Sequence, residues 1–255
     1  MAEERDVHVY LLPELAPPER LREGVAVVID VLRATTSIVH ALAAGCTAVL
    51  PCAEVDEARA LSDAMRAGRV LLAGERGGLP IPGFDLGNSP RRFTPRACRG
   101  VALVLTTTNG TRALLRCVVA ARTLVAAFVN YSAVCEQLRH ETRPVHIVCA
   151  GTDGNVTLED TLLAGALVDF LYDQGTVRLD DGARLAWDCF DTHGCCLQGA
   201  LELSHGGRNL KGLGFEEDIE AAARVDEFAL VPELRPDPLR VEVGAVGIAK
   251  SYWTK

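Results

Sequence analysis

Short apolar runs of strand length alternate with segments of helical periodicity along most of the chain. Val25–Val31 has the nearly continuous, β-branched character of a buried parallel strand. Further strands are expected at Val7–Leu12, Thr47–Leu50, Val70–Ala73, Val101–Leu105, Leu124–Val129 and Val145–Cys149. Helices are expected from about Thr36 to Gly45 and over Val55–Ala67, Gly110–Val118 and Ser132–His140. This order predicts an α/β fold with a mainly parallel sheet, in a three-layer α/β/α arrangement.

The last third of the chain has a more helical pattern. Thr157 and Asp160 have the spacing of a capping box, which predicts the start of a long helix that reaches at least Asp169. Asp181–Gly182 would suit a hairpin turn, but the apolar periodicity that follows favours a helix. Helical periodicity then continues to about Arg224.

The final segment has few regular signals. A short strand is expected at Phe228–Val231, and the prolines at 232, 236 and 238 indicate an irregular or edge segment after it. No Ser/Gly-rich linker divides the chain. We therefore expect a single domain over residues 1–255, with residues 178–226 as a candidate helical subdomain.

Composition and charge limit the classes of function. The 255 residues are 49% hydrophobic, and 34 acidic against 26 basic residues give a net charge of −8. A general nucleic-acid or anionic-membrane surface is disfavoured, because binding to phosphate backbones depends on clustered Lys and Arg. A small anionic ligand remains compatible with this charge if a few arginines gather in one cleft. The charged start, the lack of an apolar run long enough to span a membrane, and nine cysteines without a C-x-x-C pair predict a cytoplasmic protein.

Three of the expected strands run directly into small polar loops that open helices. They are Asp30–Ser37, Thr106–Arg112 and Ala150–Asn155. In open α/β sheets, ligands bind beyond the carboxyl ends of the strands, where helix N-termini offer free N–H groups to phosphate. Arg33 and Arg112 add forked, permanently charged donors. The loops therefore predict a phosphate or sulfonate site.

Each of these loops, taken alone, is also typical of ordinary helix capping by Ser, Thr, Asn and Gly. Three such loops in one chain, two of them with arginine, favour the binding interpretation. The spacing matches neither G-x-x-x-x-G-K-[ST] nor G-x-G-x-x-G. Nucleoside triphosphates and dinucleotide cofactors are accordingly disfavoured.

A fourth segment, Gly74–Pro90, contains five glycines, three prolines and two carboxylates. Loops of this length in compact domains are usually functional or disordered. Glu75 or Asp85 is a candidate ligand for Mg²⁺, which takes one or two carboxylates together with phosphate oxygens. The alternative is a surface Ω-loop in which Glu75 pairs with Arg76.

Asp30 stands at the end of an apolar strand, where a carboxylate is costly unless it is paired or metal-bound. Metal ligand, nucleophile and base are its candidate roles, and a simple ion pair with Arg33 is the alternative. Glu159 and Asp160 open a helix, where the helix dipole alone would favour them, although they could also reach the ligand of the preceding loop. His205 is a candidate general acid, against the alternative of an ordinary surface histidine.

Together these motifs resemble the 2-phosphosulfolactate phosphatase (ComB-type) family. The resemblance runs in order through VVIDVLRATTSIV (27–39), GERGG (74–78), GFDLGNSP (83–90), TTTNGT (106–111), CAGTDGN (149–155) and LEDTLLAG (158–165). GFDLGNSP and TTTNGT are the most specific of these segments. The resemblance implies Mg²⁺-dependent hydrolysis of 2-phosphosulfolactate to 3-sulfolactate and phosphate, a step of coenzyme M biosynthesis in some organisms. It also implies a homodimer.

The resulting hypothesis is a Mg²⁺-dependent phosphomonoesterase. Its catalytic candidates are Asp30, Arg33, Glu75 and His205, and its metal candidates are Asp30, Glu75 and Asp85. Its substrate-binding candidates are Arg76, Asn88, Ser89, Thr106, Thr107, Thr108, Asn109, Gly110, Thr111, Arg112, Gly151 and Thr152. Direct attack by water and a phosphorylated Asp30 both remain open. The alternatives are a phosphatase or transferase acting on another phosphorylated hydroxy acid, and a non-catalytic anion-binding protein.

Overall fold

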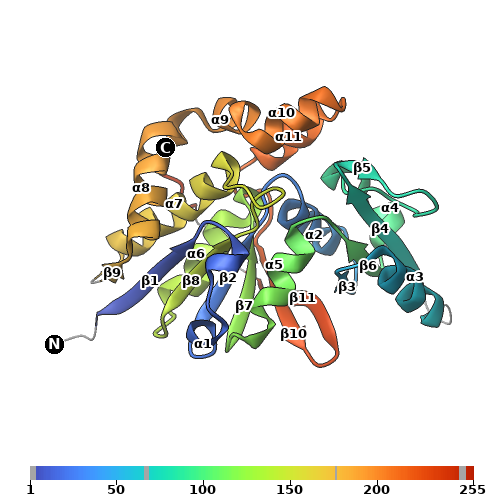
Figure 1. The fold of residues 1–255 in the computed structure, drawn as a ribbon, viewed down its shortest axis with the longest axis horizontal. Helices are drawn as coiled ribbons and strands as arrows, with labels where there is room; N and C mark the ends of the chain where they lie inside the picture. Colours follow the sequence, from blue (N-terminus) through green and yellow to red (C-terminus); the bar gives the residue numbers. More distant parts are fainter. Residues whose placement is uncertain (1–3, 66–68, 176, 247–250) are drawn as a thin grey trace.

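The computed structural model describes residues 4–65, 69–175, 177–246 and 251–255 (Figure 1). Its strands are β1 (Arg5–Tyr10), β2 (Val25–Ile29), β3 (Ala48–Cys52), β4 (Val70–Arg76), β5 (Leu79–Pro80), β6 (Ala102–Thr106), β7 (Arg122–Ala126), β8 (Val145–Cys149), β9 (Val177–Leu179), β10 (Leu230–Pro236) and β11 (Leu239–Val246). Its helices are α1 (Pro18–Leu21), α2 (Ala34–Ala43), α3 (Val55–Ala64), α4 (Pro95–Cys98), α5 (Gly110–Arg116), α6 (Tyr131–Arg139), α7 (Leu158–Asp173), α8 (Asp181–His193), α9 (Leu197–Leu203), α10 (His205–Gly212) and α11 (Glu216–Ala222).

These strands form one 11-stranded sheet in the order β5-β4-β6-β3-β11-β10-β7-β2-β8-β1-β9. β4, β6 and β3 are parallel to one another, and so are β7, β2, β8, β1 and β9. The antiparallel hairpin β10–β11 stands between the two parallel groups. In Figure 1 the two groups lie on either side of this hairpin. The prediction of a mainly parallel α/β sheet is confirmed.

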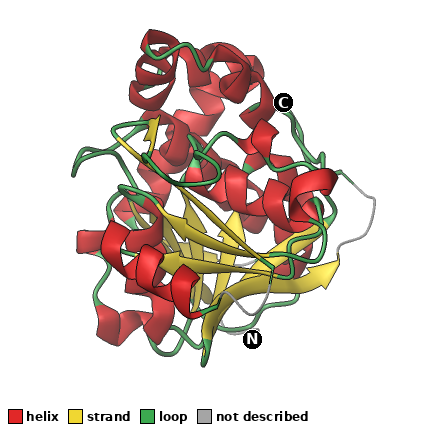
Figure 2. Cartoon of the chain, turned by 90° about the vertical axis from the view of Figure 1, so that its right-hand side faces the viewer, coloured by secondary structure: helices red, strands yellow, loops and turns green. Residues whose placement is uncertain are grey.

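Alternate residues of the central strands pack against different helices. In β2, Val25, Val27 and Ile29 belong to a core shared with α6, α7 and α8, whereas Ala26 and Val28 belong to a second core shared with α2 and α5. Figure 2 shows helices on both sides of the sheet. A strand covered on both faces has no polar side, which explains the continuous apolar run at this point in the sequence. The three-layer α/β/α prediction is therefore confirmed.

The C-terminal third is helical, as expected. The segment after Asp180 forms α8 rather than a hairpin, and the Asp180 carboxylate caps that helix by accepting a hydrogen bond from the N–H of Ala183 at 2.8 Å. Helices α9, α10 and α11 lie at the upper edge of the view in Figure 1, above the central strands. The short strand β9 ahead of α8 was not expected from the sequence. None of the helices in the described parts of the chain has the length and apolar character needed to span a bilayer.

The prediction for the proline-containing tail was wrong. Residues 230–246 form the hairpin β10–β11 in the middle of the sheet, not an irregular or edge segment. Pro232 follows a shift of register after Val231, and Pro236 occupies the last pair before the turn, opposite Leu239. Proline is tolerated at bulges and strand ends because no regular ladder hydrogen bond is lost there.

Two predicted boundaries also differ. The strand expected at Leu124–Val129 ends at Ala126, because the Asn130 side chain accepts a hydrogen bond from the N–H of Ala127 at 2.8 Å and begins a 3₁₀ turn. The helix expected to continue to Ala67 ends at Ala64, and the predicted Ala67 end lies outside the described residues.

Candidate active site

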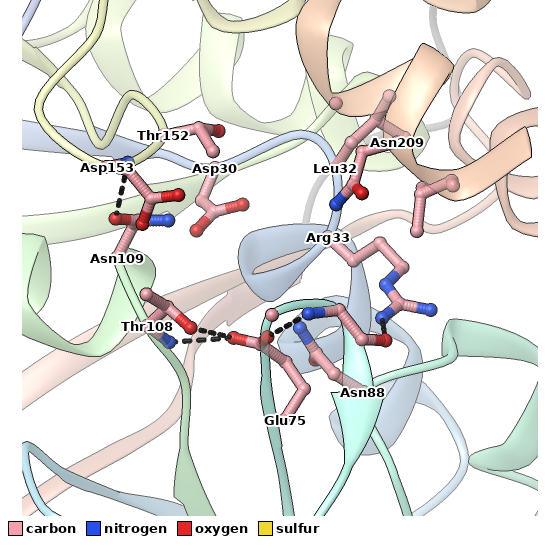
Figure 3. A pocket seen from close by; sticks show the side chains of 14 residues that line it. Asp30, Leu32, Arg33, Glu75, Asn88, Thr108, Asn109, Thr152, Asp153 and Asn209 are labelled. Carbon is pink, nitrogen blue, oxygen red and sulfur yellow. Dashed lines mark hydrogen bonds between the residues drawn. The ribbon is translucent and has the colours of Figure 1, made fainter. Parts of the chain in front are cut away.

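A cleft lies where the loops after β2, β6 and β8 meet the end of β4. Figure 3 shows how its side chains converge from segments that are far apart in the sequence. It is lined by Asp30, Leu32, Arg33, Glu75, Gly77, Gly78, Asn88, Thr108, Asn109, Thr152, Asp153, Gly206, Asn209 and Leu210. The three polar loops and the Gly74–Pro90 segment thus each contribute residues to one cavity. The strands before them belong to two parallel groups that run in opposite directions, because three antiparallel pairings separate the groups.

Asp30 directly follows β2 and is buried in the floor of the cleft. Its Oδ1 accepts a hydrogen bond from the N–H of Ala34 at 3.0 Å, and its own N–H donates to Thr35 Oγ1 at 3.0 Å. Burial, together with the negative charges of Glu75 and Glu159, raises the pKa of Asp30 to about 7, although the hydrogen bond from Ala34 opposes this shift. The carboxyl group is therefore fixed in place and able to exchange a proton near neutral pH.

Gly110 allows the start of α5 to approach Asp30 closely. A Cβ atom at position 110 would lie 2.4 Å from the Cβ of Ala34 and 2.5 Å from Oδ2 of Asp30. Only glycine fits between the first turns of α2 and α5 without displacing one of these atoms.

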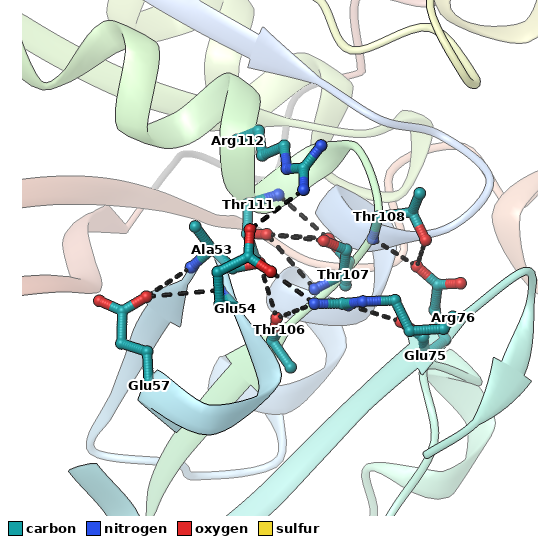
Figure 4. Close-up of polar contacts among 10 residues, drawn as sticks. All are labelled: Ala53, Glu54, Glu57, Glu75, Arg76, Thr106, Thr107, Thr108, Thr111 and Arg112. Carbon is teal, nitrogen blue, oxygen red and sulfur yellow. Dashed lines mark hydrogen bonds and ion pairs between the residues drawn. The ribbon is translucent and has the colours of Figure 1, made fainter. Parts of the chain in front are cut away.

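Glu75 joins β4 to two loops of the cleft. Its Oε1 accepts hydrogen bonds from the N–H and the hydroxyl of Thr108 at 2.7 and 2.9 Å, and its Oε2 accepts one from the N–H of Gly78 at 2.8 Å. Figure 4 shows the contact between Glu75 and Thr108. The two residues are 33 positions apart in the sequence, so Glu75 determines how the β6 loop lies over β4.

Arg76 is held outside the cleft and does not pair with the Glu75 carboxylate. It donates to the carbonyl oxygens of Glu75 and Ala53 at 2.8 and 3.1 Å, and to the hydroxyl of Thr106 at 2.9 Å. The alternative interpretation of this segment, in which the two side chains form an ion pair, is therefore wrong. Arg76 instead connects the end of β4 to Ala53 and Thr106.

Arg33 pairs with Asp218 of α11 and not with Asp30. Its Nη1 donates to Oδ2 of Asp218 at 2.7 Å, and both side chains are 3% exposed. Its Nη2 donates to the carbonyl oxygen of Gly78 at 2.6 Å, and the guanidinium lies 4.7 Å from the ring centre of Phe215. Asp218 could not be singled out from its sequence neighbours, because 185 positions separate it from Arg33.

Asp160 and Glu159 lie beneath the cleft at the start of α7. Asp160 accepts hydrogen bonds from the N–H groups of Val31 and Gly151 at 2.8 and 3.0 Å, and Glu159 accepts one from the N–H of Gly206 at 3.2 Å. Burial raises the pKa of both carboxyl groups, and the charge of Asp30 raises that of Asp160 further. The predicted capping box is wrong, since Asp160 is turned toward the loops after β2 and β8 and the Thr157 side chain makes no cap.

The threonine-rich loop after β6 divides into capping and lining residues. Thr107 Oγ1 accepts a hydrogen bond from the N–H of Thr111 at 3.0 Å, and the Thr111 hydroxyl donates to the carbonyl oxygen of Thr107 at 2.9 Å. Thr107 thus satisfies one free N–H group in the first turn of α5, although the N-cap residue Asn109 makes no side-chain cap. Thr108 and Asn109 line the cleft, so within this loop substrate binding stays a prediction for these two residues.

Three predicted residues lie in neighbouring cavities. Arg112 is exposed, pairs with Glu54 at 3.1 Å and lines a cavity that shares only Thr108, Asn109 and Asp153 with the cleft. Asp85 and Ser89 line another cavity, on the far side of Arg33. The Asp85 carboxylate accepts a hydrogen bond from the N–H of Leu72 at 2.8 Å.

The remaining predicted residues are His205, at the start of α10, and Gly151 and Thr152, in the loop after β8. His205 is exposed as the first residue of α10, and its neighbour Gly206, not the histidine, lines the cleft. Thr152 lines the cleft, whereas Gly151 has a φ of 63° and turns its N–H toward Asp160.

The sequence profile described as 2-phosphosulpholactate phosphatase matches residues 10–237. The chain belongs to this family. Three similar proteins are each named "Probable 2-phosphosulfolactate phosphatase". That of Deinococcus radiodurans is 43% identical over 232 residues, which cover 90% of this chain and 93% of the relative. Those of Caldanaerobacter subterraneus and a Picosynechococcus species are 38% and 39% identical, over 84% and 96% of this chain and 89% and 98% of their own lengths.

In this member of the 2-phosphosulfolactate phosphatase family, the cleft offers few free oxygen ligands. Among the described residues, no three His, Cys, Asp or Glu side chains form a group that could hold a metal ion. Asp30 Oδ2 makes no hydrogen bond within these residues, and Glu75 Oε2 makes one. Mg²⁺ needs only one or two carboxylates when phosphate and water oxygens complete its octahedron. The two side chains therefore fit Mg²⁺ bound together with a phosphorylated ligand, and not a cage made of protein groups alone.

Proposed function

We propose that this protein is a Mg²⁺-dependent phosphomonoesterase that hydrolyses 2-phosphosulfolactate to 3-sulfolactate and inorganic phosphate. The observation that carries the proposal is that Asp30 and Glu75 line one cleft in a chain of this family. Both are buried, both are oriented by backbone N–H groups, and both keep acceptor positions open. Such a pair is suited to hold a cation beside a phosphoryl group.

The charge of the cleft supports the metal. Asp30, Glu75 and Asp153 line it, and Arg33 is the one cation among the lining residues that the structure describes. The charge of Arg33 is already balanced by Asp218. A phosphorylated ligand would be repelled from this surface without a further positive charge. Mg²⁺ held by Asp30 and Glu75 would supply that charge, polarise the phosphoryl group and lower the pKa of a bound water.

The residues of the chain provide the neutral contacts. Asn88 is buried in the wall of the cleft, and its Oδ1 has no hydrogen-bond partner within the described residues. Buried side-chain amides normally have hydrogen-bond partners within the protein. Because Asn88 Oδ1 lacks one within the described residues, the amide is available to contact a ligand. Thr108, held over β4 by Glu75, and Asn109 face the same space. These groups would orient the substrate, while the buried floor around Asp30 limits the access of water.

The proposed route of hydrolysis has two forms. In the first, a water molecule attacks phosphorus, the P–O bond to sulfolactate breaks, and the leaving oxygen takes up the proton that water loses. In the second, Asp30 Oδ2 attacks phosphorus and the same bond breaks, so that sulfolactate leaves with a proton from solvent. Water then hydrolyses the aspartyl phosphate, which frees Asp30 and inorganic phosphate and returns a proton to solvent. Rapid quenching of a single turnover of ³²P-labelled substrate, followed by peptide mapping, separates them. A label on the peptide that contains Asp30 supports the second form, and a label found only in free phosphate supports the first.

The proposed function is tested by phosphate release from a panel of phosphorylated hydroxy acids, with MgCl₂ and with EDTA. We expect release from 2-phosphosulfolactate, its loss in EDTA, and a decrease of at least about 100-fold in Asp30→Asn and Glu75→Gln. Transfer of the phosphoryl group to another acceptor would replace the phosphatase with a transferase. Tight binding without turnover would indicate an anion-binding protein.

A homodimer, a cytoplasmic location and a role in coenzyme M biosynthesis stay predictions. Sedimentation equilibrium tests the first of them directly.

A further inference from the structure

The guanidinium of Arg33 is held at three points in the wall of the cleft. Nη1 donates to Asp218 at 2.7 Å, Nη2 donates to the carbonyl oxygen of Gly78 at 2.6 Å, and the flat face lies over Phe215. Two hydrogen bonds in the plane and one contact on its face fix both the position and the rotation of a planar, five-donor group. Arg33 therefore has one orientation in the cleft.

Asp218 is itself fixed from a different loop. Its Oδ1 accepts a hydrogen bond from the hydroxyl of Ser89 at 2.6 Å, while Oδ2 faces Arg33. Ser89 directly follows Asn88, whose side chain lines the cleft. The contacts thus link the Gly74–Pro90 segment, α11 and the loop after β2 around one buried carboxylate.

A purely structural role does not require charges at this place. A buried ion pair is costly to desolvate, and apolar side chains of similar volume commonly hold elements together as well or better. Here the pair stands beside a cleft in which Arg33 is the lining cation, and the other charged lining residues that the structure describes are Asp30, Glu75 and Asp153. Its Nε and the second hydrogens of Nη1 and Nη2 make no other hydrogen bond within the described residues. They remain free to donate to an oxyanion.

We propose that Asp218 is a positioning residue, which holds Arg33 so that the guanidinium binds an oxygen of the anionic substrate. This proposal rests on the proposed function and extends the site to α11, in the helical C-terminal third. Asp218 itself touches no substrate in this arrangement. Its effect is on the direction of the Arg33 donors.

The test compares Asp218→Asn, Asp218→Glu, Ser89→Ala and Arg33→Lys with the wild-type protein. The measurements are kcat and KM for the phosphate ester, the inhibition constant of inorganic phosphate, and the midpoint of thermal unfolding. In Asp218→Asn we expect KM and the inhibition constant to rise by about 10- to 100-fold, the range for a hydrogen bond to a charged group. Asp218→Glu, which keeps the charge, restores part of the loss. Ser89→Ala, which removes one support of Asp218, has a smaller effect in the same direction.

A double mutant links the effect to Arg33. Arg33→Lys keeps the positive charge but loses the fork, so it weakens phosphate binding by itself. Because Asp218 acts only through Arg33, Asp218→Asn adds little when Arg33 is already lysine.

The matched control is Glu233 of β10, a buried carboxylate that also pairs with arginines. It lies 3.1 Å from Arg122 and 2.8 Å from Arg235, outside the cleft. We expect Glu233→Gln to lower the unfolding midpoint while kcat, KM and the inhibition constant stay within about twofold of wild type. This control distinguishes two effects. The loss of any buried ion pair lowers stability, whereas the loss of the Arg33 orientation weakens phosphate binding.

The outcomes distinguish this proposal from the proposed function. If the wild type is active and a folded Asp218→Asn or Ser89→Ala variant binds phosphate as tightly as wild type, Asp218 is not a positioning residue. If the wild type releases phosphate from no ester in the panel, the proposed function fails. Calorimetric binding of inorganic phosphate with Mg²⁺ then still decides the role of Asp218, and equal affinities of wild type, Asp218→Asn and Asp218→Glu would overturn it.

Discussion

The carboxylate of Asp160 accepts a hydrogen bond from the backbone N–H of Val31 at 2.8 Å. Its other oxygen accepts one from the N–H of Gly151, so a single buried side chain sets the spacing between the loops after β2 and β8. Val31 directly follows Asp30. The position of the candidate catalytic carboxylate therefore depends on a residue that does not line the cleft.

Replacing Asp160 by asparagine should destabilise the protein and lower activity. The amide keeps one acceptor but turns an N–H group toward one of the two backbone donors. We expect a loss of about 1–3 kcal/mol in the free energy of unfolding, measured by urea denaturation. Asp181→Asn is the control, because Asp181 is also in the first turn of a helix but is exposed. Equal effects of the two variants would mean that Asp160 acts only through the helix dipole.

The stability of the metal-free protein should fall as pH rises from about 4 to 8, partly because of Asp30. Burial raises the pKa of Asp30 from 3.8 to about 7. The folded protein holds this proton in a pH range where the unfolded chain has lost it. The contribution is therefore complete below about pH 4 and is lost as pH rises through 7, with a slope of at most about 1.4 kcal/mol per pH unit. Urea denaturation in EDTA at several pH values should show a shallower slope for Asp30→Asn, whereas parallel slopes would contradict the raised pKa.

Glu75 and Asp85 should differ in their effect on the metal requirement. Glu75 lines the cleft with Asp30, whereas Asp85 lines the neighbouring cavity and receives the N–H of Leu72. We expect Glu75→Gln to raise the Mg²⁺ concentration for half-maximal phosphate release by about tenfold or more. Asp85→Asn should lower stability and leave that concentration near its wild-type value. The reverse order would assign the metal to Asp85.

Adding a single methyl group at Gly110 should impair catalysis. The new Cβ would overlap Asp30 Oδ2 and Ala34, and a displacement of the carboxylate by about 1 Å is expected to cost roughly 100-fold in kcat. Gly212, at the end of α10, is the control because a Cβ there meets no atom within 4 Å. Gly212→Ala should leave kcat unchanged. Steady-state kinetics of both variants make the comparison, and an active Gly110→Ala would show that the first turn of α5 can move.

The sequence predicted the features that depend on residues close together in the chain. The apolar run of β2 reflects burial on both faces, and the polar residues after β2, β6 and β8 mark the strand ends that meet at the cleft. Asp30 could be singled out because a carboxylate beside an apolar strand needs a partner. Glu75 could be singled out, together with Asp85, because it lies in a long segment rich in Gly and Pro. These inferences use only neighbours in the sequence and the geometry of a parallel sheet.

What the sequence missed depends on partners far along the chain. Asp218 lies in an ordinary acidic first turn of α11, and nothing in that turn indicates that it pairs with Arg33. The capping-box spacing of Thr157 and Asp160 is a local rule that is overridden by the backbone donors of Val31 and Gly151. Pro232 and Pro236 suggested an edge because their lost donors are costly in a regular ladder, but a register shift and a turn stand where they occur.

The hairpin β10–β11 has a consequence for how the two carboxylates of the cleft are held apart. In the sheet, the block of β3, β6 and β4 and the block of β7, β2 and β8 join through residues 230–246. Asp30 follows a strand of one block, and Glu75 belongs to a strand of the other. A substitution in the hairpin that shifts one block against the other would therefore change the separation of Asp30 and Glu75, although the hairpin does not line the cleft.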